Sequence, residues 1–304
     1  MSPARSATRL LDRFGPDLAA LSGDELAAAI TASEGRVLLG EIIANAAPLL
    51  AGSSNAELVA AMGADLICLN LFDPSRDDLP VLGLEELDPA PTRLTGLSTL
   101  LGRPVGLNLE PDVEEVPPPF RATKRQVDAA ALSGTAFVMV TANPGRDVGE
   151  AELAAAVDVV RTTAPELLCL AGKMHQAGRR EELGPATVEA LADAGAHGVL
   201  VPLPGTVPGM SEDRARAMTN AAHRRELLAV GTIGTSQEGA DPDTIRRLAL
   251  TAKRVGVDLH HLGDAGLTGV AQPENVYTYG VAVRGVRHTW NRMARNHRST
   301  WGGH

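Results

Sequence analysis

The chain has 304 residues, of which 44% are hydrophobic, 21% charged and only 3% aromatic, and its formal net charge is −9. This length allows one large domain or two ordinary ones. The acidic balance and the scarcity of aromatic residues disfavour a nucleic-acid-binding protein, which needs a basic stripe or aromatic stacking platforms.

The sequence also disfavours a membrane or secreted protein. No apolar stretch approaches the roughly 18–20 residues that span a bilayer, and the N-terminal segment lacks the apolar core of a signal peptide. The two cysteines, Cys68 and Cys169, lie in apolar runs and fit no metal or disulfide pattern. We therefore expect a cytoplasmic protein that binds neither nucleic acid nor membranes.

Eight short apolar runs recur along the chain, and a segment with helical character follows each of them. Runs of this kind, apolar on both faces, are typical of buried parallel strands. The predicted strands cover residues 36–44, 65–71, 104–109, 136–141, 167–172, 197–203, 227–233 and 257–262. Eight strand–helix units predict a (β/α)8 TIM barrel. A doubly wound sheet is the alternative, but no Gly-rich dinucleotide fingerprint follows the first strand.

The remaining segments complete this organisation. Residues 1–33 are predicted to form an N-terminal helical extension that covers the N-terminal face of the barrel. Residues 34–304 form the barrel itself, which ends in a long basic C-terminal helix. Two long polar loops, residues 73–91 and 110–119, follow strands 2 and 3, where barrel enzymes build lids and substrate contacts.

Polar residues gather at the carboxyl ends of the predicted strands, where TIM-barrel enzymes carry their active sites. We predict four catalytic residues: Lys173, His175, Glu110 and Glu41. We predict eight substrate-binding residues: Asn45, Asn70, Asn108, Thr141, Asn143, His260, His261 and Asp264.

Lys173 is one of only three lysines among 28 basic residues. An ammonium group can lose its proton and form a Schiff base with a carbonyl substrate, whereas a guanidinium group cannot. His175, two residues later, has the near-neutral pKa of a proton shuttle. The structural alternative is that Lys173 only pairs with Glu110 or Glu41.

Alternation along the strands refines this picture. On strand 5, Cys169 and Ala171 share a face with Lys173 and His175. Small residues would thus lie below polar ones and leave space for a ligand. On strand 3, residues 106, 108 and 110 share a face in the same way. The other two lysines, at positions 124 and 253, are expected on solvated helix faces.

A metal site is the alternative use of these residues. His260 and His261 are consecutive, so only one of them can face inward. With His175 and Glu110 or Glu41, that histidine would complete a ligand set, although no tight ligand spacing supports it. We predict no cofactor, and keep a divalent metal at His175, His261 and Glu110 as the alternative.

The loops after strands 7 and 8 read GTIGTS (231–236) and GDAG (263–266). Many barrels hold a phosphate on backbone N–H groups at these two positions. The predicted phosphate-binding residues are Gly231, Thr232, Gly234, Thr235, Ser236, Gly263 and Gly266. The alternative is two tight turns, because acidic residues 238, 241 and 264 surround them; Arg146, Arg179 or Arg180 would have to supply positive charge.

The last 26 residues, from position 279, hold five arginines and no acidic residue, which leaves −14 (−9 minus +5) on the rest of the chain. Arginines near a helix C-terminus complement its dipole. We expect either a capped closing helix or an arm that docks on an acidic surface of the same or a neighbouring subunit.

The runs GTSQEGAD (234–241), HHLGDAG (260–266), PEN (273–275) and RGVRHTWNRMAR (284–295) resemble the phosphate-binding (β/α)8-barrel superfamily. Within it, the chain is similar to an uncharacterised bacterial family associated with sugar phosphotransferase gene neighbourhoods, which implies a sugar phosphate. The segment NAELVAAMGADLICLN (55–70) faintly resembles phosphoenolpyruvate-mutase-like barrels, without a clear acidic metal-binding pattern after it.

Together these features predict a lyase or isomerase, a homo-oligomer that acts on a small, phosphorylated carbonyl metabolite. It would catalyse aldol-type C–C cleavage or enolisation, with Lys173 as electrophile or acid and His175 or Glu110 as proton shuttle. The asparagines at positions 70, 108 and 143 would orient hydroxyl groups. The alternatives are a metal-dependent hydrolase or isomerase and a non-catalytic metabolite sensor with the basic arm as its output surface.

Overall fold

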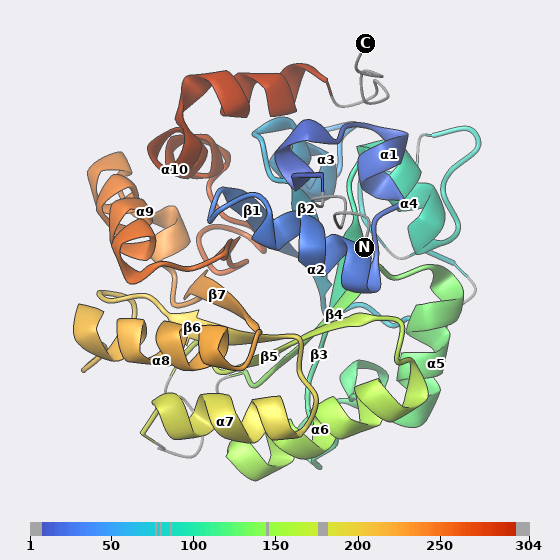
Figure 1. The fold of residues 1–304 in the computed structure, drawn as a ribbon. Helices are drawn as coiled ribbons and strands as arrows, with labels where there is room; N and C mark the ends of the chain where they lie inside the picture. Colours follow the sequence, from blue (N-terminus) through green and yellow to red (C-terminus); the bar gives the residue numbers. More distant parts are fainter. Residues whose placement is uncertain are drawn as a thin grey trace, which may run out of the picture.

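The computed structural model of the chain describes residues 8–76, 78–79, 81–85, 87–143, 146–175 and 182–295. Eight parallel strands follow one another around a closed barrel, and β8 pairs with β1 (Figure 1). The strands are β1 (Val37–Ile43), β2 (Leu66–Asn70), β3 (Val105–Leu109), β4 (Phe137–Thr141), β5 (Leu168–Gly172), β6 (Gly198–Pro202), β7 (Leu228–Ile233) and β8 (Leu259–Leu262). The predicted TIM barrel is confirmed.

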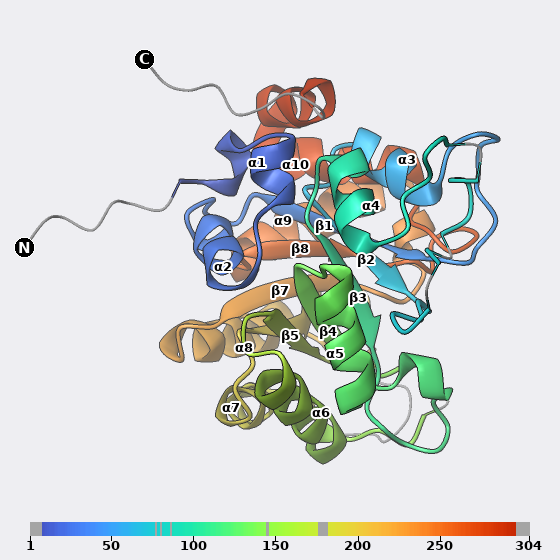
Figure 2. The same cartoon turned by 90° about the vertical axis from the view of Figure 1, so that its right-hand side faces the viewer.

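A ring of helices surrounds the barrel, one after each strand (Figures 1 and 2). They are α3 (Asn55–Ala61), α4 (Leu94–Leu101), α5 (Lys124–Ser133), α6 (Glu150–Thr163), α7 (Pro185–Asp193), α8 (Glu212–Arg224), α9 (Pro242–Val255) and α10 (Pro273–Ala294). Short 3-10 turns η2 (Pro118–Phe120) and η3 (Gln237–Gly239) lie in the loops after β3 and β7.

Local sequence signals explain where α9 begins and ends. The Asp241 side chain accepts hydrogen bonds from the backbone N–H groups of Asp243 and Thr244, and Pro242 occupies the first turn. Gly256 ends the helix with a φ of 94°, a left-handed conformation that favours glycine. Both signals are visible in the sequence.

Strand side chains form two apolar layers because both faces of each strand are buried. Leu39, Leu66 and Leu170 belong to the cluster that fills the inside of the barrel. Leu38 and Ile67 belong to a separate cluster between the strands and the helices. These two layers show which face of each strand points inward.

The N-terminal extension closes one end of the barrel. It comprises η1 (Leu10–Asp12), α1 (Pro16–Ala19) and α2 (Gly23–Thr31) (Figure 2). Its apolar side chains join the inner cluster. The Gly23 N–H donates to the carbonyl of Ala136, the residue just before β4. The extension therefore covers the N-terminal face, and a ligand must approach from the opposite end.

The C-terminal helix docks on its own barrel through buried charges. Arg284 and Arg292 both pair with Asp65, the residue before β2, and all three side chains are almost fully buried. Gly285, with a φ of 74°, breaks the predicted single long helix into two segments at a kink, visible in Figure 1. The predicted docking of this arm on the same subunit is thus observed for these two arginines.

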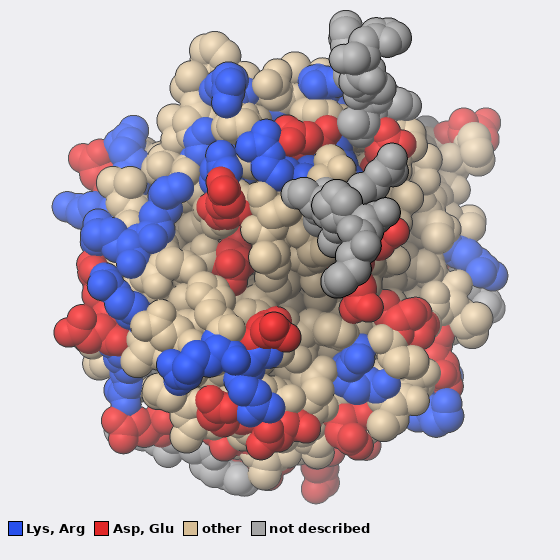
Figure 3. Space-filling view, viewed as in Figure 1, with Lys and Arg blue, Asp and Glu red and all other residues tan. Residues whose placement is uncertain are grey.

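The molecular surface carries mixed charge. Figure 3 shows acidic and basic side chains interspersed over one face. Within the described ranges, no helix has the length and apolar character needed to cross a bilayer.

Candidate active site at the carboxyl end of the barrel

A chain of hydrogen bonds crosses the inside of the barrel near the carboxyl ends of its strands. His261 Nε2 lies 2.9 Å from Glu41 Oε2, and Asn108 Nδ2 donates to Glu41 Oε1 at 2.7 Å. Thr141 Oγ1 donates to Asn108 Oδ1 at 2.6 Å. We call these four residues the polar chain. They come from β8, β1, β3 and β4, and none is more than 2% exposed.

Strand alternation places these side chains inside. Asn108 shares the inward face of β3 with Gly106, where a Cβ atom would collide with the ring of Phe137 in the inner cluster. Gly106 and Asn108 of the predicted face of strand 3 thus point inward, whereas Glu110 lies with Asn143 and Arg146. Glycine at position 106 leaves room for the Phe137 ring below the polar chain.

Two further carboxyl groups adjoin the polar chain. Asn70 Nδ2 donates to Asp264 Oδ2 at 2.8 Å. Burial, together with the charge of Glu41, raises the pKa of Asp264 to about 6. Glu238, in η3, is completely buried, and burial raises its pKa to about 7. The Glu238 carboxyl interacts electrostatically with His261, Asp264 and Glu41. We call these groups the acidic cluster.

Several polar atoms of this cluster have no hydrogen-bond partner among the described residues. They are both carboxyl oxygens of Glu238, Nδ1 of His261 and the hydroxyl of Thr232, which is the register partner of His261 on β7. Buried polar atoms nearly always have partners in folded proteins. Their gathering here indicates a place for water, a proton or a polar ligand.

Glu110 forms a second polar group on the loops after β3 and β4. Its Oε2 accepts a hydrogen bond from the Asn143 backbone N–H at 3.2 Å and lies 3.6 Å from Arg146 Nε. The Glu110 side chain is buried, whereas Asn143 and Arg146 are partly exposed. Arg146, a predicted source of positive charge for a phosphate, therefore pairs with the Glu110 carboxylate. The other two candidates, Arg179 and Arg180, lie outside the described residues.

Lys173 and His175 follow β5 and are both buried. Burial and the charge of Lys173 lower the pKa of His175, which favours its neutral form. The prediction that small residues leave space for a ligand below them is wrong, because Cys169 and Ala171 face the helices. The inside of the barrel at β5 is filled by larger apolar side chains, those of Leu168, Leu170 and Met174.

Two predicted substrate-binding residues lie elsewhere. His260 faces the helices, with Nδ1 2.9 Å from the Tyr279 hydroxyl and Nε2 3.0 Å from the Gly35 carbonyl. Burial lowers the pKa of His260 to about 4, which keeps it neutral. His261 is thus the inward member of the pair. Asn45 is exposed in a turn beyond β1, outside both polar groups.

The structure also argues against the predicted phosphate site. The Gly263 N–H donates to the Ile233 carbonyl, and the Thr235 hydroxyl donates to the Thr206 carbonyl. The other predicted glycines pack against protein, Gly231 on Leu203 and Val257, Gly234 on Met174 and Gly266 on the backbone of Gly239. Ser236 precedes η3 with a φ of 75°, and Thr232 points into the acidic cluster.

The acidic side chains near these two loops also oppose the binding of a phosphate. The buried carboxyl of Glu238 occupies the place that a Cβ on Gly263 would take. In their ionised forms, which burial disfavours, Glu238 and Asp264 would repel a phosphate held between these two loops. The GTIGTS and GDAG loops therefore pack around the acidic cluster at the carboxyl end of the barrel.

The comparisons with known proteins identify the family. A family model for the domain of unknown function DUF7916 matches residues 11–299. The chain belongs to the DUF7916 family. The predicted similarity to an uncharacterised family is thereby confirmed, whereas the phosphate-binding superfamily and the gene neighbourhood remain predictions. No curated protein matches the chain in sequence.

Solved structures share the fold of this DUF7916 chain at low sequence identity. The structure of 2,3-dimethylmalate lyase, a PEP mutase/isocitrate lyase superfamily member, is 14% identical with a TM-score of 0.50, covering 91% of this chain and 88% of its own. The structure of oxaloacetate acetylhydrolase is also 14% identical, with a TM-score of 0.48 and 82% of each chain covered. These similarities concern the fold.

The described residues do not assemble the predicted metal site. Among them, no three His, Cys, Asp or Glu side chains are arranged to hold a metal ion. His261 is bonded to Glu41 in the polar chain, while Glu110 lies with Asn143 and Arg146. The alternative ligand set of His175, His261 and Glu110 is thus not formed.

Glu238 is the functional candidate that the sequence analysis missed. From the sequence, Glu238 is only a charge that opposes phosphate binding, because a turn has no periodicity that indicates where its side chain points. The available signal was the pair of glycines at positions 239 and 263, which allow close packing around a buried carboxyl.

Proposed function

We propose that the protein is an enzyme, a lyase or isomerase, that forms and protonates the enolate of a small carbonyl compound. The observation that carries this proposal is the polar chain beside Glu238, whose pKa of about 7 lies where a general acid works best. The site lies at the carboxyl end of a TIM barrel, the end that carries the active sites of enzymes with this fold.

His261 would act as the base. When its Nε2 carries the proton and donates to Glu41, Nδ1 keeps a lone pair, and Nδ1 has no partner among the described residues. Glu41 thus sets the tautomer and stabilises the imidazolium ion that forms when Nδ1 takes a proton from carbon. Asn108 and Thr141 hold Glu41 in place.

Glu238 would act as the acid. In its protonated form it donates its proton to the oxygen on which the enolate charge develops, which gives the enol, and its carboxylate takes that proton back when the enol returns to the carbonyl form. Enolisation and retro-aldol cleavage share this requirement for one base and one acid. The 2,3-dimethylmalate lyase fold has the same architecture, but a fold hosts many chemistries, so the proposal rests on the residues.

Lys173 is the proposed electrophile for the cleavage branch. It is buried directly after β5, at the carboxyl end of the barrel, and a lysine amine can form a Schiff base with a carbonyl carbon. The proposal does not require a phosphate on the substrate, because acidic groups surround the loops predicted to hold one.

The test is a turnover screen of the purified protein with small 2-keto acids and aldol adducts, followed by mass spectrometry. We expect turnover of at least one compound, with a rate about 100-fold lower in His261→Asn and Glu238→Gln. The exposed variant Glu25→Gln should match the wild type. Saturable binding without turnover would instead show a sensor, and unchanged rates in both site variants would refute the assignment.

Borohydride trapping separates the two branches of the reaction. If cleavage proceeds through a Schiff base, reduction during turnover should add one substrate fragment to the protein, absent from Lys173→Arg. Turnover without any trapped fragment would leave Lys173 as a hydrogen-bond donor and the reaction as direct enolisation.

A further inference from the structure

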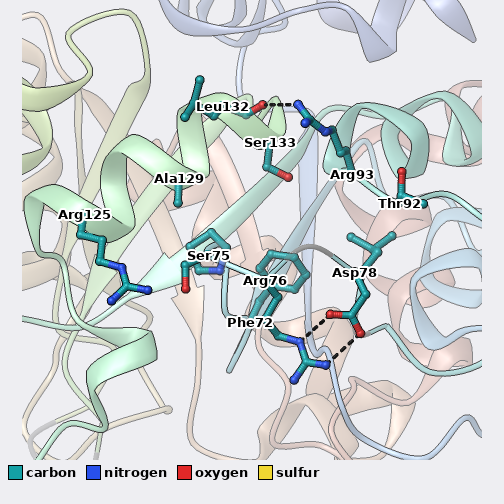
Figure 4. Close-up of a pocket in the computed structure, with 12 residues that line it drawn as sticks. Phe72, Ser75, Arg76, Asp78, Thr92, Arg93, Arg125, Ala129, Leu132 and Ser133 are labelled. Carbon is teal, nitrogen blue, oxygen red and sulfur yellow. Dashed lines mark hydrogen bonds and ion pairs between the residues drawn. The ribbon is translucent and has the colours of Figure 1, made fainter.

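A pocket lies outside the barrel, between the loop after β2, the start of α4 and one side of α5 (Figure 4). Its volume is about 310 Å³. None of its lining residues belongs to the polar chain or the acidic cluster, so its occupant is independent of the proposed reaction.

Three arginines from three separate segments line this pocket. Arg76 lies in the loop after β2, Arg93 caps the start of α4 and Arg125 lies in the first turn of α5 (Figure 4). The one acidic lining residue is Asp78, so the lining carries a net charge of +2 (three arginines minus one aspartate). This is unusual in a chain whose net charge is −9.

Two of the three guanidinium groups are available to a ligand. Arg125 makes no hydrogen bond or ion pair within the described part of the chain. Arg93 has a single long contact, from Nη1 to the Leu132 carbonyl at 3.4 Å. Arg76, by contrast, is held by both oxygens of Asp78 at 2.7 and 2.8 Å.

The rest of the lining favours a ligand with both an acceptor and an apolar part. The Ser133 hydroxyl accepts a hydrogen bond from the Leu94 N–H and keeps its own proton to donate. Ala129 and the nearly buried Phe72 line the pocket, and Leu132 beside them is 76% exposed. Leu132 therefore offers the apolar part of a bound molecule a contact surface at the edge of the pocket.

We propose that this pocket binds a small organic anion, a phosphate or carboxylate group attached to an apolar or aromatic body. The guanidinium groups of Arg93 and Arg125 lie on different sides of the pocket (Figure 4), so one of them holds the anionic group through charge-assisted hydrogen bonds while the other adds positive charge. Leu132, Phe72 and Ala129 contact the apolar body.

Isothermal titration of the full chain with phenyl phosphate tests this inference. We expect one saturable site, about tenfold weaker binding in Arg93→Gln and in Arg125→Gln, and wild-type binding in Arg216→Gln, an exposed arginine on α8. Benzyl alcohol, which lacks the charge, should not bind. Benzoate in parallel shows whether carboxylate or phosphate is preferred, and either preference fits the proposal.

A fourth variant tests the apolar part. Leu132→Ser should weaken the binding of phenyl phosphate but leave the weaker binding of inorganic phosphate unchanged. The variants change exposed side chains, so the fold should persist, and circular dichroism checks this. Absence of saturable binding, or equal affinity in wild type, Arg93→Gln and Arg125→Gln, would overturn the inference.

Discussion

Glu238 carries a buried carboxyl group without a hydrogen-bond partner among the described residues, and its burial opposes ionisation. The group is therefore protonated in the folded protein at a pH where it is ionised in the unfolded chain. The same property that suits it to acid catalysis costs stability at high pH. Function and stability at this one residue are thus linked and can be measured separately.

The linkage predicts a pH dependence of unfolding. The pKa of Glu238 rises from 4.5 to about 7 on folding, so its contribution to stability is fully present below pH 4.5 and is lost as the pH rises through 7. Glu238→Gln lacks this loss. Relative to the wild type, it should gain about 2–3 kcal/mol between pH 5 and pH 8.

Urea unfolding at the two pH values measures this gain, with Glu25→Gln as the exposed control. A constant difference between Glu238→Gln and wild type at both pH values would show that the carboxyl is ionised in the fold.

The direction of single side chains was only partly predictable from the sequence. Glu41 and Asn108 could be placed because each lies near the end of a strand in which polar residues are rare. The inward face of β5 could not be predicted, because Leu168, Cys169, Leu170 and Ala171 are all apolar. When both faces of a strand are buried, the sequence shows no polar–apolar alternation that tells the two faces apart. His260 and His261 illustrate the same limit, since only the packed helices reveal which one faces inward.

At the scale of elements, α10 depends on charges buried under it. Burial alone would raise the pKa of Asp65, but Arg284 and Arg292 lower it, and the net shift is downward. Arg292 also donates to the carbonyls of Leu10 and Arg13 and so ties α10 to the N-terminal extension. The fully buried Arg103 lies beside them, with its pKa lowered by burial.

Removal of the Asp65 carboxylate, which both arginines share, should destabilise the docking of α10 on the barrel. Asp65→Asn leaves buried arginines without their counter-ion, and we expect a loss of about 3–5 kcal/mol in the free energy of unfolding. The control is Asp193→Asn, which removes an exposed partner of Arg225 and should cost less than about 1 kcal/mol. Chemical denaturation measures both, and similar small losses would contradict a structural role for the buried pair.

The order and type of the elements were predictable, and the kink in α10 was not. Each of the eight strands lies within two residues of its predicted ends, because short runs of apolar residues between helical segments leave few alternatives. Gly285 lies in the middle of a pattern that reads as one helix. Arg284 and Arg292, on the two sides of this residue, both pair with Asp65, a tertiary contact that no local pattern encodes.

At the scale of the whole molecule, the two ends of the barrel have different roles. The N-terminal face is closed by Leu18, Leu26 and Ile30 of the extension, which pack with the inner apolar cluster. The carboxyl end holds the polar chain and the acidic cluster. Stability and proposed chemistry are thus separated along the barrel axis, as is usual for this fold.

This separation predicts that the extension is part of the barrel's core. Deletion of residues 1–33 should expose the apolar end of the barrel and give an aggregated or unfolded protein. Deletion of residues 1–7 alone should leave a folded protein. Size-exclusion chromatography and circular dichroism distinguish these outcomes, and a folded, monodisperse protein without residues 1–33 would show that the barrel does not need its cover.

The central claim is that His261 moves a proton on and off a carbon atom next to a carbonyl group. Proton NMR of small 2-keto acids in D2O, with and without the protein, measures this directly. We predict protein-catalysed replacement of hydrogen by deuterium at that carbon for at least one keto acid, abolished in His261→Asn and slowed in Glu41→Gln. Exchange no faster than in buffer for every keto acid, or exchange that persists unchanged in His261→Asn, would contradict the account.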